Sequence, residues 1–183
     1  MKIQLNIGCG SKDFGKDWVH IDGGNYPHLD SNDIINLPYE DNSVDLIYAS
    51  HVIEYFDREE VIPILSGWKS KLKPGGILRL AVPDFYAMAK LYLEKPLTFS
   101  IEDFLGPLYG KMEMGNETIY HKTAYDHESL FDLLVGDLEF SKAMEWDWKY
   151  KDHGIYDDCS QAYLPKMDKD NGVLISLNME AIK

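Results

Sequence analysis

Short apolar runs of strand length recur along the chain, separated by segments with turn or helix signals. Seven of these runs predict strands, at residues 3–8, 18–22, 33–36, 44–50, 77–82, 141–148 and 173–181. The run at 44–50 is mostly apolar, which is typical of a strand buried on both faces of a parallel sheet. The link between the first two strands is too short for the full helix of an ordinary crossover, so a turn is expected there.

Helical spacing of apolar side chains predicts helices between the later strands. Asp57 is an N-cap candidate with Glu60 three residues on, and apolar residues then recur at helical spacing until a Pro-Gly-Gly ends the pattern. A second helix is expected over 86–93, and a third after the N-cap candidate Asp126. Residues 95–125 are rich in proline and glycine at their start, which predicts an irregular insertion or lid.

Strands that alternate with helices make an open α/β sheet, and the final two strands can pair antiparallel because the long loop between them imposes no crossover. Ligands of such sheets bind beyond the carboxyl ends of the strands, at a switch point in strand order. Five candidate residues fall at those ends: Gly8, Asp22, Asn36, Ser50 and Asp84. Their convergence predicts a ligand cleft along that edge of the sheet.

The ends of the first two strands carry a glycine turn followed by an acid. Gly8 and Gly10 can adopt backbone angles closed to other residues, so the chain can turn tightly and approach a ligand closely. Asp22 is then placed to accept hydrogen bonds from the hydroxyls of a ribose. A nucleotide-like cofactor is one interpretation. A plain turn in which the glycines serve only geometry is the other, because short glycine motifs are weak signals.

The residues after this turn argue against a phosphate-bearing cofactor. Asp13 holds the place of the third glycine of a dinucleotide-binding fingerprint, and a carboxylate there would repel a pyrophosphate. The chain contains no P-loop motif. A cofactor with adenosine but no phosphate fits better, and the cationic S-adenosylmethionine suits an acidic site.

Composition narrows the class of protein. The chain has 183 residues of which 45% are hydrophobic, so one globular domain over 1–183 is expected. The net charge of −13 makes nucleic acid an unfavourable partner. Cys9 and Cys159 lie far apart in no zinc motif, and no metal site is expected. No leader and no apolar run of membrane length is seen, so a cytoplasmic protein without membrane contact is expected.

Several blocks of the sequence resemble the class I S-adenosylmethionine-dependent methyltransferases, in particular their small bacterial members. The similar blocks are residues 5–10 (LNIGCG), 21–22 (ID), 37–47 (LPYEDNSVDLI), 50–55 (SHVIEY), 72–78 (LKPGGIL) and 121–130 (HKTAYDHESL). The resemblance implies a Rossmann-like, mostly parallel sheet of seven strands, the last of them antiparallel, with helices on both faces. It also implies S-adenosylmethionine as the cofactor.

Two positions depart from the family pattern. Tyr55 stands where the second residue of a Glu-His pair is usual, which leaves the substrate chemistry open. Asn36 stands where an acid is common before Leu-Pro, so its amide oxygen would have to bind the adenine amino group.

The resemblance assigns cofactor contacts to eight residues: Asn6, Gly8, Gly10, Asp22, Asn36, Leu37, Ser50 and His51. The glycines would approach the cofactor through their backbone, and Asp22 would bind the ribose hydroxyls. Asn36 and Leu37 would line the adenine, while Ser50 and His51 would approach the methionine end.

Methyl transfer is a direct displacement, so the enzyme mainly aligns the reacting atoms. A hydroxyl acceptor must also lose a proton, and histidine is the usual base. His51 and His121 are the leading catalytic candidates, followed by His127 and Asp84, although such residues often serve only structure. Glu54 is expected to fix its loop. Five tyrosines could line an acceptor pocket or a core edge: Tyr55, Tyr86, Tyr109, Tyr120 and Tyr125.

The leading hypothesis is a methyltransferase that uses S-adenosylmethionine to methylate a small-molecule or glycan-precursor acceptor, as a monomer or a homodimer. The alternative is a catalytically inactive module that binds the cofactor or regulates a partner, which Tyr55 and the short first crossover favour. A nucleotide-dependent oxidoreductase is the third hypothesis.

Overall fold

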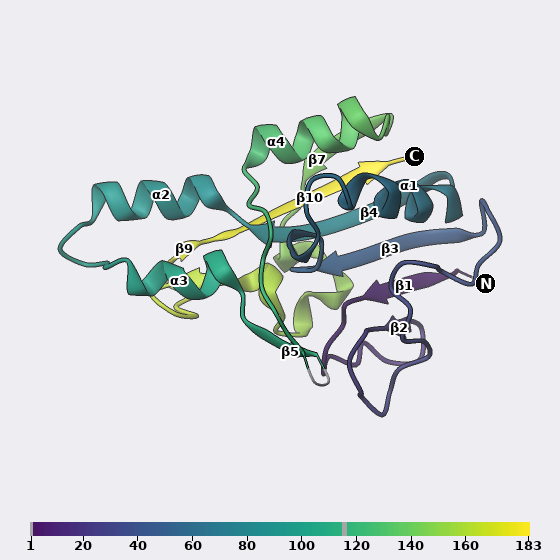
Figure 1. Ribbon diagram of the computed structural model, residues 1–183, viewed down its shortest axis with the longest axis horizontal. Helices are drawn as coiled ribbons and strands as arrows, with labels where there is room; N and C mark the ends of the chain where they lie inside the picture. The colour runs from purple at the N-terminus through teal and green to yellow at the C-terminus, as the bar shows by residue number, and fades with distance from the viewer. Residues whose placement is uncertain (1, 115–116) are drawn as a thin grey trace.

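A six-stranded sheet forms the centre of the computed structural model, which describes residues 2–114 and 117–183 (Figure 1). The strand order across the sheet is β2-β1-β3-β4-β10-β7. Its strands are β1 Gln4–Ile7, β2 Val19–Ile21, β3 Val44–Ser50, β4 Leu72–Pro83, β7 Lys142–Glu145 and β10 Ser176–Ile182. The first four strands in this order are parallel, and β10 runs antiparallel to both of its neighbours. The Rossmann-like fold class, with its last strand inserted antiparallel, is confirmed.

The predicted strand at 33–36 is wrong. At this edge of the sheet Ser31 makes a single parallel bridge to Ile21, and the chain then turns. The Asp33 carboxylate accepts the backbone N–H of Ile35 at 2.9 Å and of Asn36 at 2.8 Å. A short acidic side chain that captures nearby backbone donors in this way favours a turn over a strand. Within the described residues, the seventh strand position is therefore reduced to one bridge.

One face of the sheet is covered by α-helices. The α-helices are α1 Val61–Lys71, α2 Phe85–Glu94, α3 Glu102–Tyr109 and α4 His127–Phe131, and α4 continues into the π-helix η2 Asp132–Asp137. Helices α1 and α4 share one apolar core with the sheet, in which Leu5, Leu65 and Leu130 are fully buried. Figure 1 shows α2 and α3 beyond the carboxyl ends of the parallel strands instead.

The other face of the sheet is covered by short 3₁₀-helices and aromatic rings. These helices are η3 Trp148–Tyr150, η4 Asp152–Ile155 and η5 Cys159–Gln161. Phe14, Tyr48 and Trp146 form the buried aromatic layer beneath them. The segment predicted to be loop therefore supplies the second layer of the fold.

The reciprocal hydrogen bonds predicted for Asp57 and Glu60 are present, but they close the turn before the first helix, because α1 begins at Val61. The Asp57 carboxylate accepts the N–H of Glu60 at 2.8 Å, and the Glu60 carboxylate accepts the N–H of Asp57 at 3.1 Å. Inside α1, the buried Trp68 donates its indole N–H to the carbonyl of Ile34 at 2.8 Å. The helix thereby anchors the turn that follows Ser31.

The region expected to be an irregular lid, 95–125, is more ordered than predicted. Besides α3, it contains the hairpin of β5 (Met112–Met114) and β6 (Glu117–Ile119), while residues 115–116 lie outside the described residues. A small apolar cluster holds α2 and α3 together around Met88 and Phe104. The remaining elements are the 3₁₀-helix η1 (Ile53–Tyr55) and the paired strands β8 (Tyr163–Leu164) and β9 (Val173–Leu174). Across the described residues, no helix combines the length and apolar character needed to cross a membrane.

Candidate cofactor and catalytic site

The glycine turn after β1 has the tight backbone that the sequence predicts. Gly8 and Gly10 have φ angles of 68° and 54°, in the left-handed region that favours glycine. The Gly8 N–H donates to the carbonyl of Ile21 at 2.7 Å, which ties the turn to the end of β2. A Cβ on Gly8 would collide with the side chain of Val52, so this position accepts only glycine without rearrangement.

Asp22 lies directly beside this turn and is 7% exposed. One carboxylate oxygen accepts the N–H of Gly10 at 2.8 Å and the other accepts the N–H of Gly24 at 2.7 Å. Each carboxylate oxygen can accept a second hydrogen bond, so both still have capacity for a ligand. The carboxylate is thus fixed in orientation at the mouth of a cleft that it shares with Gly8.

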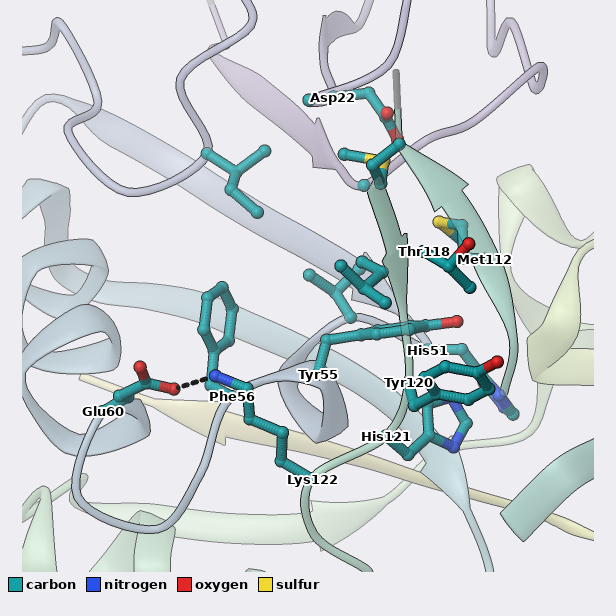
Figure 2. Close-up of a pocket in the computed structure, with 16 residues that line it drawn as sticks. Asp22, His51, Tyr55, Phe56, Glu60, Met112, Thr118, Tyr120, His121 and Lys122 are labelled. Carbon is teal, nitrogen blue, oxygen red and sulfur yellow. Dashed lines mark hydrogen bonds and ion pairs between the residues drawn. The ribbon is translucent and has the colours of Figure 1, made fainter. Parts of the chain in front are cut away.

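Two clefts meet at the carboxyl ends of the parallel strands. The first cleft, of about 540 Å³, lies between Asp22, Ile34, Phe56 and the β5–β6 hairpin (Figure 2). The second cleft, of about 560 Å³, is lined by Asn6, Gly10, Ser50 and Asp158, among others. The residues common to both clefts are Gly8, His51, Tyr55, Met112 and His121. In Figure 2, Asp22 lies at one end of the first cleft and His121 at the other.

Two polar atoms in the second cleft are buried without a hydrogen-bond partner among the described residues. They are the Asn6 amide nitrogen Nδ2 and the Ser50 hydroxyl oxygen Oγ. Both residues lie on strands, at the carboxyl-terminal parts of β1 and β3. Because buried polar groups are normally paired, such atoms beside a cleft indicate where a ligand would bind.

His51 and His121 both lie close to the carboxyl group of Glu54. The Glu54 oxygen Oε1 lies 3.5 Å from Nδ1 of His51 and 3.7 Å from Nε2 of His121. Burial lowers the pKa of His51 to about 3 and also lowers the pKa of His121. Both histidines are therefore neutral bases at physiological pH.

Glu54 is fully buried, and neither of its carboxyl oxygens has a hydrogen-bond partner in the described part of the chain. Burial raises the pKa of this carboxyl to about 8. The expectation that Glu54 fixes its loop has a basis in the backbone, because its carbonyl accepts the N–H of Lys122 at 2.8 Å. The side chain makes no such contact, so loop fixing does not account for it.

Tyr55, the residue that departs from the family pattern, joins η1 to the lid. Its hydroxyl donates to the carbonyl of Gly110 at 2.6 Å, and its ring meets the ring of His121 edge-on at 4.6 Å. Gly110 has a φ of 49°, and a Cβ there would collide with His121. The tyrosine therefore holds the end of α3 against the histidine.

Two of the predicted adenine contacts lie away from the clefts. Asn36 is exposed and donates its side-chain amide to Asp33 at 3.0 Å. Leu37 is 6% exposed and packs into the main core. Ile34 lines the first cleft in their place, so the turn that replaces the predicted strand also changes which residue faces the cavity.

The weaker catalytic candidates are also separated from the clefts. His127 is on the surface, 3.7 Å from Glu145, and Asp84 caps α2 by accepting the N–H of Ala87 at 3.0 Å. Among the tyrosines, Tyr55 and Tyr120 line a cleft. The other three do not line either cleft: Tyr86 and Tyr109 are exposed and Tyr125 is buried.

Asp158 is a site residue that the sequence argument missed. It lines the second cleft, where it accepts the hydroxyl of Tyr48 at 2.6 Å and the N–H of Ser160 at 2.9 Å. Burial raises the pKa of its carboxyl, although these hydrogen bonds oppose the shift. Asp158 lies in a polar stretch with no strand or helix period, and only its Asp-x-Ser turn pattern could have singled it out.

Comparison with known proteins supports the resemblance seen in the sequence. A family model described as a methyltransferase domain matches residues 22–80, from Asp22 into β4. No curated protein matches the chain.

Solved structures of methyltransferases share the fold. The chain is similar to an S-adenosylmethionine-dependent methyltransferase from Archaeoglobus fulgidus, with 18% identity and a TM-score of 0.57 over 100% of this chain and 86% of that one. It is similar to another from Methanosarcina mazei, with 20% identity and a TM-score of 0.56 over 99% and 92% of the two chains. A third is the Burkholderia thailandensis 1,6-didemethyltoxoflavin-N1-methyltransferase with bound S-adenosylhomocysteine, at 13% identity, with a TM-score of 0.54 over 99% and 70%. The recognition of the class I methyltransferase fold from its sequence blocks is thus confirmed.

Proposed function

We propose that this protein is a methyltransferase that uses S-adenosylmethionine to methylate a small-molecule or glycan-precursor acceptor. The observation that carries the proposal is the meeting of three features at one edge of the sheet. These are a glycine turn with no room for a side chain at Gly8, the oriented carboxylate of Asp22, and the polar atoms of Asn6 and Ser50 that have no partner among the described residues. The family match and the shared fold point to the same chemistry.

The residues present fit this cofactor in charge and in hydrogen-bonding capacity. Asp22 would hold the ribose hydroxyls, with Ile34 lining the adenosine part of the first cleft. Asn6, Gly10 and Ser50 would hold the methionine part in the second cleft. When bound, the cofactor supplies a methyl group on a cationic sulfur, which an acidic site attracts.

The acceptor is proposed to enter where the two clefts meet. His51 and His121 line both clefts there, and neutral imidazoles can take the proton of an O–H or N–H acceptor. The β5–β6 hairpin covers the first cleft, and Met114 packs against Gly23. This cover excludes water and helps to orient the reacting groups.

Cofactor binding is tested by thermal unfolding with S-adenosylmethionine, S-adenosylhomocysteine or NAD. A ligand at about a hundred times its Kd adds about 2.7 kcal/mol of stability, which raises the Tm of a chain of this size by roughly 5–10 °C. We expect this shift with the first two ligands and none with NAD. A shift with NAD alone would instead support an oxidoreductase.

Asp22→Asn tests the site itself. Loss of the charged acceptor should weaken S-adenosylhomocysteine binding by about tenfold to a hundredfold, because hydrogen bonds to charged groups contribute about 1.5–3 kcal/mol. The matched control is Asp17→Asn, which changes an exposed acid in the same β1–β2 link and should leave affinity unchanged. Equal affinity of the two variants would remove Asp22 from the site. Binding without turnover across a panel of acceptors would favour the inactive-module alternative.

A further inference from the structure

Glu54 is a buried acid with no cation within ion-pair distance among the described residues. Its side chain has no exposed surface. The titratable side chains closest to its carboxyl oxygen in these contacts are the imidazoles of His51 and His121. The fixed hydrogen bonds of these imidazoles reveal where the protons of the cluster lie.

The proton of His51 is assigned by a chain of contacts in β10. Asn178 donates its amide to the carbonyl of Ser160 at 2.9 Å, so its amide oxygen faces Ser176 and accepts the Ser176 hydroxyl at 2.9 Å. With that hydroxyl proton used, the Ser176 oxygen accepts the Nε2–H of His51 at 3.2 Å. A neutral His51 then has no proton on Nδ1, the atom that faces Glu54.

His121 has the same arrangement with its nitrogens exchanged. Its Nδ1–H donates to the carbonyl of Pro107 at 3.1 Å, which leaves a lone pair on Nε2 facing Glu54. Two lone pairs directed at one carboxyl oxygen repel a carboxylate and attract a carboxylic acid. The resting cluster therefore holds one proton on Glu54.

The other titratable groups near Glu54 supply no compensating charge. Burial raises the pKa of Tyr55 to about 12, and it also raises the pKa of Tyr125, whose hydroxyl is buried without a partner. Desolvation raises the pKa of the Cys159 thiol to about 11. Lys122 points its ammonium at Glu60, 2.8 Å away, and the exposed Arg58 reaches the carbonyl of Ala124 at 3.4 Å.

We propose that Glu54, between His51 and His121, is a charge-compensating proton site that gives up its proton when the cationic cofactor binds. This inference rests on the proposed function, because it requires S-adenosylmethionine at the junction of the two clefts. The ionised Glu54 balances the positive sulfur, so the net charge of the sulfur and the His51–Glu54–His121 cluster together equals that of the resting cluster alone.

The same site then receives the proton that the reaction releases. As the acceptor oxygen or nitrogen bonds to the methyl carbon, the carbon–sulfur bond breaks and its electron pair stays on sulfur. The Glu54 carboxylate takes up the proton that the acceptor loses, which restores the neutral acid. The cluster returns to its resting state beside the neutral product cofactor.

Calorimetric titration in buffers of different ionisation enthalpy tests this inference without any acceptor. At about pH 7, below the Glu54 pKa of about 8, S-adenosylmethionine should release about one proton per bound molecule. The neutral S-adenosylhomocysteine should release close to none. Glu54→Gln mimics the neutral acid and should abolish the release, whereas any proton released by the ligand amine would still be released by this variant. The control Glu59→Gln, an exposed acid before α1, should retain it.

A second measurement needs no variant. As pH rises towards 8, affinity of the wild-type protein for S-adenosylmethionine should increase by about tenfold per pH unit relative to S-adenosylhomocysteine. Binding of both ligands with equal proton release and a constant affinity ratio would overturn the inference and leave the proposed function intact. Failure of both ligands to bind would overturn the proposed function and the inference with it.

Discussion

Two acid–base clusters among the described residues, one around Glu180 on β10 and one around Glu54 in η1, differ in how their charge is balanced. In the first, Glu180 accepts Arg79 at 2.9 Å and Lys151 at 3.1 Å, so two cations neutralise it. In the second, Glu54 has two neutral imidazoles and no cation within ion-pair distance among the described residues. The first cluster lies beneath the aromatic layer, and the second lies at the junction of the two clefts.

This difference indicates that the charges of the first cluster stabilise the fold, whereas the second cluster can exchange a proton. Arg79 also contacts Nε2 of His153 at 3.0 Å, and burial, aided by Arg79 and Lys151, lowers the pKa of His153 to about 3. The Glu180 carboxylate is thus balanced by cations within the fold. Glu54 is instead balanced by a proton, which can leave when a ligand brings a positive charge.

The largest expected effect is on stability, from Glu180→Gln. Removal of this carboxylate leaves Arg79 and Lys151 without a buried counter-charge, which should cost about 3 kcal/mol. Glu54→Gln replaces a neutral acid by a neutral amide of the same size, so it should cost less than about 1 kcal/mol at neutral pH. Urea unfolding of both variants measures the contrast. Equal losses would show that the two clusters do not differ in charge balance.

The second effect is a pH dependence that belongs to Glu54 alone. Its pKa is about 8 in the folded protein against an ordinary value of 4.5, so unfolding releases its proton over this interval. The stabilising contribution is complete below pH 4.5 and is lost as pH rises towards 8. Between about pH 5 and 7, the wild type should lose roughly 2 kcal/mol relative to Glu54→Gln.

Glu54→Gln is needed as the reference because the buried histidines change the stability with pH in the opposite direction. His51 has a folded pKa of about 3, so its contribution is lost as pH falls below its ordinary 6.5. Both proteins contain His51, and this term cancels in their difference. A pH-independent difference between wild type and Glu54→Gln would mean that Glu54 is ionised in the folded state.

The smallest effects distinguish two histidines that both lie near a glutamate. His121→Gln loses the bond to Pro107 and should cost about 1–2 kcal/mol, while it slows methyl transfer and spares S-adenosylhomocysteine affinity. His127→Gln alters an exposed contact with Glu145 and should change stability by less than about 0.5 kcal/mol. Normal turnover in His121→Gln would assign that residue to structure alone.

The fold was predictable where a local pattern dictates it. The apolar run at 44–50 forms β3, and Asp57 and Glu60 make their expected reciprocal hydrogen bonds in the turn that precedes α1. The strand at 33–36 failed because one carboxylate, that of Asp33, captures the backbone donors. The β5–β6 hairpin was missed because its three-residue strands are largely exposed and too short for a reliable alternating pattern.

The candidate site likewise contains residues that the sequence predicts and residues that only the folded structure brings together. Gly8 and Gly10 precede Asp22 by fourteen and twelve residues, so the motif together with its place at the strand ends predicted this part of the site. Asp158 and the Glu54–His121 contact join segments that only the folded chain brings together. The protonation of Glu54 could not be predicted at all from the sequence, because it depends on the hydrogen bonds that Asn178 accepts from Ser176 and Pro107 accepts from His121.

The central claim is that an adenosine-bearing cation binds across the ends of β1, β2 and β3. The most direct test is a crystal structure of the protein grown with S-adenosylhomocysteine. The account predicts ribose hydroxyls on the Asp22 carboxylate, and the amino-acid part of the ligand within hydrogen-bond distance of Asn6 Nδ2 and Ser50 Oγ. A ligand bound elsewhere, with Asp22 still contacting only Gly10 and Gly24, would contradict it.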